Sequence, residues 1–196
     1  MKTLLKFITA ILILCSTQID AQESIKPLRI GAKIGVPNII SANLEYVTPL
    51  LDNRVSIMLD YMSLSKTVDD VNVNYNNFEI GSNIYINNTG KGFYGGISYF
   101  SFNAEGTYSD VEFDSGTNEG TANIEFNTIN LKIGAKLGRT FFFRIEAGYG
   151  LGEIPEYVVV KSNSNNETSI EEIPEVPGIS ESGLPVFNIG IGFSFM

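Results

Sequence analysis

Eight stretches of this chain alternate apolar residues with small or polar ones, and a period of two is the pattern of a β-strand whose two faces meet different surroundings. In residues 129–137, Ile, Leu and Ala occupy the odd positions, whereas Asn130, Lys132, Gly134 and Lys136 occupy the even ones. The stretches are residues 28–36, 42–48, 55–62, 78–86, 93–102, 129–137, 141–151 and 187–195. The pattern predicts an all-β chain of eight strands.

The connectors between these stretches alternate in length. Those after the second, fourth and sixth stretches are short, whereas residues 103–128 and 152–183, after the fifth and seventh, form long loops. Residues 65–77 are intermediate, and the short first connector, 37–41, departs from the alternation. Short turns at one end and long loops at the other are typical of a transmembrane β-barrel.

Residues 1–21 have the layout of a secretory signal peptide. Two lysines precede a short apolar run at 8–14, and Ala21 offers a small residue for cleavage. The run is too short to span a bilayer, and no later segment reaches the ~20 apolar residues of a transmembrane helix. We therefore expect an exported barrel domain at residues 22–196.

The only cysteine, Cys15, lies inside this leader. A lipoprotein anchored at Cys15 is the alternative, although Leu14 stands where lipoprotein signals carry a small residue. Cleavage after Ala21 instead leaves a mature chain with no thiol, no disulfide and no cysteine metal ligand.

One face of the strands is regularly apolar, and the other carries glycines and isolated charges. The charged set holds five basic and four acidic residues: Arg29, Lys33, Glu45, Asp60, Glu79, Lys132, Lys136, Arg144 and Glu146. The interior of an eight-stranded barrel only just accommodates its side chains, and buried charges are normally paired. We therefore expect this set to form a charge network in an occluded lumen, with the apolar face turned outward.

Aromatic residues gather at both ends of the strands. Beside the short turns lie Tyr46, Phe93, Phe141, Phe143, Phe193 and Phe195, and at the opposite ends lie Tyr61, Phe78, Tyr99, Tyr149 and Phe187. Two aromatic bands around aliphatic middles indicate the interface girdles of a membrane-spanning barrel. The alternative is that these rings fill the core of a water-soluble β-protein.

Three other phenylalanines do not fit the outward phase. Phe100 and Phe102 point away from the apolar face of their stretch, and Phe126 is out of phase with the next one, which we interpret as a bulge or a loop stem.

Residues 103–128 contain two alternating segments around a Gly/Asn-rich turn, which predicts that the fifth and sixth strands continue as a ribbon. Residues 157–160 predict a short strand extension before a mobile polar segment.

With these features, the chain resembles the small eight-stranded outer-membrane barrels of the outer-membrane protein A and X types. The resemblance covers residues 28–196 and includes the aromatic-rich closing stretch 187–196, although Phe195 is penultimate and Met196 is last. It implies an antiparallel up-and-down transmembrane β-barrel in the outer membrane of a Gram-negative bacterium. It also implies a monomer that is surrounded by outer-membrane lipid and inserted by the barrel-assembly machinery. Because this family includes structural anchors, adhesins and small channels, the resemblance does not specify a role.

The composition excludes several kinds of chemistry. The chain has no histidine, which removes imidazole acid–base catalysis and histidine metal sites, and the small barrel enzymes of outer membranes use a catalytic histidine. A net charge of −9 argues against nucleic acid as a partner. Glu45 and Asp60 could do acid–base work as a pair, but pairing with lumen arginines explains them better. We expect no enzyme, no cofactor and no bound metal.

The long loops are acidic. Of the 21 acidic residues of the mature chain, 15 lie in the three larger loops, where only Lys66 and Lys161 offset them. A solvated outer surface explains this charge. The more specific alternative is that divalent cations bind at residues 114–119, because this segment supplies oxygen ligands, although it lacks the spacing of a calcium-binding loop.

These observations lead to a non-enzymatic outer-membrane barrel with a porin-like fold and a structural or surface-interaction role. Both termini and the short turns are expected to face the periplasm, and the acidic loops the cell surface. A narrow outer-membrane pore is one alternative, and a soluble exported ligand-binding β-barrel is another.

Overall fold

The computed structural model describes residues 25–68, 71–113, 116–165, 167–173 and 178–195, so the expected signal peptide and Cys15 lie outside the described residues. The described part of the chain holds no helix long and apolar enough to cross a membrane. It contains β1 (Leu28–Val36), β2 (Ile39–Val47), β3 (Val55–Val68), β4 (Val71–Tyr85), β5 (Gly92–Phe113), β6 (Gly116–Gly138), β7 (Phe141–Leu151), β8 (Tyr157–Ser162), β9 (Thr168–Glu172) and β10 (Gly183–Phe195).

Eight of the ten strands close into a ring. The sheet runs from β5 through β4, β3, β2 and β1 to β10, β7 and β6, and β5 also pairs with β6. Every ladder is antiparallel, and the last strand pairs with the first along the whole length of β1, from Leu28 opposite Phe195 to Val36 opposite Phe187. The ring confirms the predicted all-β antiparallel architecture. The total of eight strands was wrong, because two more lie outside the ring.

The extra strands form a hairpin in the last long loop. Residues 157–160 were expected to extend the preceding strand, but β8 instead pairs with β9 and with β6, where Gly120 lies opposite Ser162. Val160 packs there with Phe113 and Ala122 in a small separate core. The polar sequence of β9 gave no apolar alternation from which a strand could be predicted.

Strands β3 and β4 extend further than expected. The intermediate connector at 65–77 is largely paired strand, with Leu64 opposite Tyr75 and Thr67 opposite Asn72. Residues 71–76 do alternate, with Val71, Val73 and Tyr75 between asparagines, but the exposed side of this extension carries Asn, Ser and Thr in place of apolar residues. The predicted ribbon of β5 and β6 is present, and its one register shift lies between Tyr108 and Val111.

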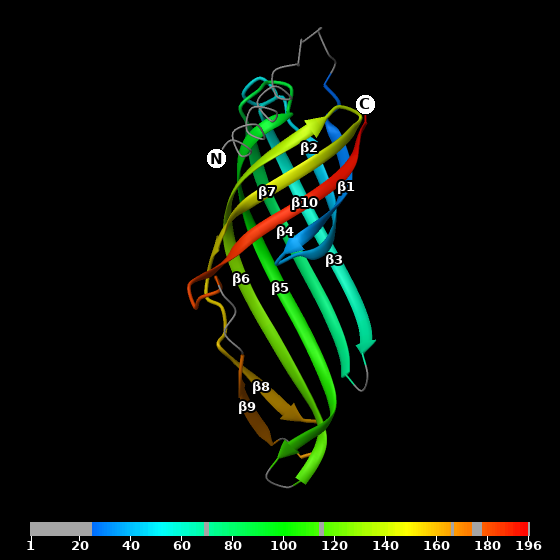
Figure 1. The fold of residues 1–196 in the computed structure, drawn as a ribbon, viewed down its shortest axis with the longest axis vertical. Helices are drawn as coiled ribbons and strands as arrows, with labels where there is room; N and C mark the ends of the chain where they lie inside the picture. Colours follow the sequence, from blue (N-terminus) through cyan, green and yellow to red (C-terminus); the bar gives the residue numbers. More distant parts are fainter. Residues whose placement is uncertain (1–24, 69–70, 114–115, 166, 174–177, 196) are drawn as a thin grey trace, which may run out of the picture.

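The ring has two unlike ends. The C-terminus and the turns that join β2 to β3, β4 to β5 and β6 to β7 lie at the end shown at the top of Figure 1, here called the turn end. The β5–β6 ribbon extends beyond the other strands at the opposite, loop end, with the β8–β9 hairpin beside it. The tight β6–β7 turn begins at Gly138, whose φ of 100° favours glycine.

The distribution of apolar and polar side chains on the wall of the ring is the reverse of that in a water-soluble protein. Large apolar side chains face outward, and Ile133 is 73% exposed. Polar and charged side chains face the lumen, where Glu45 is fully buried. Burial alternates residue by residue along β2 and β7, as the sequence period requires.

Candidate functional site: the charged lumen and its two ends

All nine of the charged residues expected in the lumen are buried there, at exposures of 3% or less, and they come from six strands of the ring. Eight of them join in ion pairs with one another. Among the described residues only Lys136 of this set has no carboxylate partner.

Glu45 is the centre of the network near the turn end. Its Oε2 accepts from Nη1 of Arg29 at 3.1 Å and pairs with Nη2 of Arg144. Its Oε1 accepts hydrogen bonds from Ser56 at 2.5 Å and Tyr85 at 2.8 Å. A buried carboxylate needs this many donors because it has lost its hydration.

Deeper in the lumen, Lys33 bridges two carboxylates on different strands. Its Nζ lies 2.7 Å from Oδ2 of Asp60 on β3 and 3.1 Å from Oε2 of Glu146 on β7. Gly190 on β10 makes room for this bridge, since a Cβ there would lie 3.1 Å from Cγ of Lys33 and 3.7 Å from Cβ of Arg144.

A further ion pair lies at the end of the network nearest the loop end. Nζ of Lys132 lies 2.7 Å from Oε1 of Glu79. The same carboxylate oxygen accepts from Asn130 at 3.1 Å and from the hydroxyl of Ser98. Acids and bases therefore neutralise one another across the lumen, as expected for charges in a space without free water.

The uncharged hydrogen-bond donors of this network were not predicted from the sequence. Besides Ser56, Ser98 and Asn130, they include Tyr94, which donates to Glu146 at 2.6 Å, and Asn43, which donates to Asp60 at 2.5 Å. All five stand at lumen-facing positions of their strands, so the strand phase could have identified them.

Aromatic side chains cover the network at the loop end. The ring of Phe100 is fully buried, and the rings of Phe102 and Phe126 stack above it. The expected bulge at Phe126 is wrong: this residue lies directly opposite Phe102 in regular register and faces the lumen, as the stem of the ribbon. Tyr75 packs edge-on against Phe102 at 4.9 Å.

A cavity of about 400 Å³ lies beyond this aromatic cover, between the ribbon and the last loop. Its lining includes Phe102, Phe126, Ile154 and Ile179, with Glu172 and Glu181 among the polar residues. Burial of Tyr75, which also lines it, raises the pKa of that phenol to about 12.

The eleven aromatics expected at the membrane interfaces are all exposed on the outer wall. Toward the turn end, Phe141 lies opposite Phe193, and Leu28 lies between Tyr46 and Phe195. Toward the loop end, Tyr61 lies opposite Phe78. None of the eleven takes part in the lumen network.

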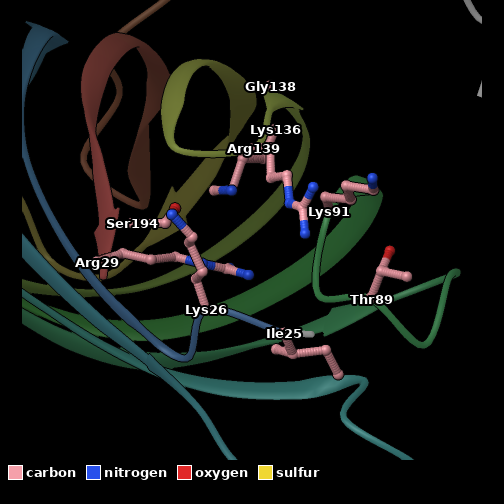
Figure 2. Close-up of a pocket in the computed structure, with 9 residues that line it drawn as sticks. All are labelled: Ile25, Lys26, Arg29, Thr89, Lys91, Lys136, Gly138, Arg139 and Ser194. Atoms are coloured by element: carbon pink, nitrogen blue, oxygen red, sulfur yellow. The ribbon is translucent and has the colours of Figure 1, made fainter. Parts of the chain in front are cut away.

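The turn end holds a small basic pocket. Figure 2 shows Lys26, Arg29, Lys91, Lys136 and Arg139 around it, with Thr89 and Ser194. Nζ of Lys136 lies 4.6 Å from the centre of the Phe142 ring. No carboxylate lies within ion-pair distance of this ammonium in the described part of the chain.

No group of three or more metal-binding side chains occurs in the parts of the chain that the structure describes. Asp114, in the acidic segment weighed as a cation site, lies outside those parts. Divalent cations at the loops therefore stay a prediction.

Fold and lumen together define a closed antiparallel β-barrel with a self-paired charged interior and an apolar exterior. Two crystal structures of Acinetobacter baumannii proteins are similar to it. CarO2 has 14% sequence identity and a TM-score of 0.46, and the match covers 88% of this chain and all of CarO2. CarO has 13% sequence identity and a TM-score of 0.45, and the match covers 86% of this chain and 98% of CarO. No protein-family model and no curated protein matches the sequence. The resemblance to the outer-membrane protein A and X types stays a prediction.

Proposed function

We propose that this chain is a non-enzymatic integral outer-membrane β-barrel that spans the membrane as a monomer and presents its acidic loops at the cell surface. The observation that carries the proposal is the inverted wall, with apolar side chains exposed all around a ring whose buried interior is charged. Water is a poor solvent for such an exterior, whereas lipid is a good one.

The closed ring supports the same environment. Within lipid every backbone N–H and C=O needs a partner from the protein, and only helices and closed barrels provide one. Here each of the eight ring strands pairs on both sides. The exposed aromatics at both ends of the apolar belt suit the two headgroup regions.

A charge placed on the outer wall tests this proposal. Ile133 is 73% exposed and lies opposite Gly95 and Ala147, in the middle of the belt. In a bilayer, Ile133→Arg should destabilise the barrel by ~2–4 kcal/mol, the cost of arginine near the midplane. The matched control is Ile170→Arg on β9, which is 68% exposed but outside the ring, and its cost should stay below ~1 kcal/mol.

Both variants are measured by urea unfolding in phospholipid vesicles, alongside fractionation of cells that express the natural chain. Recovery in the soluble periplasm without detergent, together with equal small effects of both arginines, contradicts the proposal and favours a soluble exported barrel.

A further inference from the structure

The basic pocket at the turn end is lined by five cations and, among the described residues, by no carboxylate. Arg29 and Lys136 line it, and both side chains are 2% exposed. Glu45 pairs with both Arg29 and Arg144, and among the described residues no carboxylate lies within ion-pair distance of Lys136, whose ammonium packs on the face of Phe142. A buried ammonium without a counter-charge is costly, so this arrangement favours a negative ligand.

Unpartnered polar atoms belong to the same pocket. Nε of Arg29, Oγ of Ser194 and Oγ1 of Thr89 are buried, and none of them has a hydrogen-bond partner. Buried polar atoms are nearly always hydrogen-bonded, so three such atoms around one cavity indicate a shared acceptor.

The size and position of the pocket restrict the ligand. Its enclosed part is about 20 Å³, enough for one group the size of a water molecule. The rim carries further cations, including Lys26, whose Nζ donates to Oγ1 of Thr140 at 2.8 Å. A tetrahedral anion can place one oxygen inside and leave the others at this rim.

We propose that this pocket binds a phosphate-class oxyanion, one oxygen of which is held by Arg29, Lys136 and Ser194. The anion is either free phosphate or the phosphate of a lipid headgroup, because the turn end lies at the level of the Phe141 and Phe193 band. Binding of free phosphate does not depend on the proposed membrane location, since the binding groups belong to the lumen mouth, whereas binding of a lipid headgroup rests on that proposed function.

Calorimetric titration of the full mature chain in maltoside detergent with inorganic phosphate, at constant ionic strength, tests the proposal. The natural chain should bind with a saturable heat. Lys136→Met should weaken binding about tenfold, as expected for the loss of one charge-assisted hydrogen bond. Lys66→Met, at an exposed position near the loop end, is the matched control and should bind like the natural chain.

If Lys136→Met does not fold, Ser194→Ala provides a second test of the proposed anion site. It removes only the unpartnered hydroxyl and should weaken phosphate binding several-fold while circular dichroism and the unfolding midpoint stay unchanged. Adding short-chain phosphatidylglycerol distinguishes the two sources: competition with phosphate assigns the site to a lipid headgroup, and its absence assigns it to the free anion. No saturable heat in the natural chain, or equal affinity in the Lys136, Ser194 and Lys66 variants, overturns the proposal.

Discussion

The rings of Phe102 and Phe126 stack face to face across β5 and β6, with centroids 4.5 Å apart and planes inclined by 18°. This pair stands above Phe100 and the Lys132–Glu79 ion pair, so apolar and charged layers block the lumen in succession. The stack explains why two aromatics from separate strands share the phase opposite to the outward-facing aromatics.

We expect no stable single-channel currents from the purified protein in planar bilayers. Lys33 pairs with Asp60 and Glu146 across the lumen and Lys132 pairs with Glu79, so a passing ion would have to displace buried ion pairs. Phe102→Ala should also stay silent, because the Lys132–Glu79 layer beneath it is intact. Stepwise currents from the natural chain would favour the narrow-pore alternative.

Glu45→Gln should destabilise the barrel by ~3–5 kcal/mol in urea unfolding, because Arg29 and Arg144 would then lack a shared buried counter-charge. The double variant Glu45→Gln/Arg144→Met should cost less than the sum of the two single variants. Glu112→Gln, at an exposed position of the ribbon, is the control and should change little. Strict additivity would show that Glu45 and Arg144 do not depend on each other.

Single cysteines can test the orientation, because the mature chain is expected to have none of its own. Ser164→Cys lies in the exposed β8–β9 turn, and Arg54→Cys lies in the exposed turn before β3. A membrane-impermeant maleimide added to intact cells should label Ser164→Cys, whereas Arg54→Cys should react only after the outer membrane is opened. The reverse pattern would invert the topology.

The β8–β9 hairpin should detach without unfolding the ring. Val160 is 5% exposed and packs on Phe113 and Ala122, so Val160→Asp places a charge in that small core. Hydrogen exchange at β8 and β9 should rise, while the unfolding midpoint of the ring stays within experimental error. Val159→Asp, at 44% exposure on the same strand, should leave the exchange unchanged.

The sequence was most informative where the strands carry an uninterrupted apolar outer face. The bounds of β1 and β7 were predicted residue for residue, because their outward side chains alternate without interruption. Beyond the belt the exposed positions of β4, such as Asn72 and Asn74, are polar, so its extension lacks the apolar outward face of the other strands although Val73 and Tyr75 alternate with them. Glu45 and Asp60 were both expected to pair with lumen arginines. Glu45 does so, with Arg29 and Arg144, whereas Asp60 pairs with Lys33, because strand tilt and stagger determine which distant side chains share a level.

The ladder between β1 and β10 also imposes an order on assembly. Because Leu28 pairs with Phe195, the wall can close only after the final strand has been synthesised and delivered. Pairing of distant segments is slow, since the entropy of loop closure opposes it before any pairing energy is gained. Until then β1 and β10 each present an open edge on which another chain could add a strand. Correct assembly of this protein therefore depends on keeping newly made copies apart until each has closed on itself.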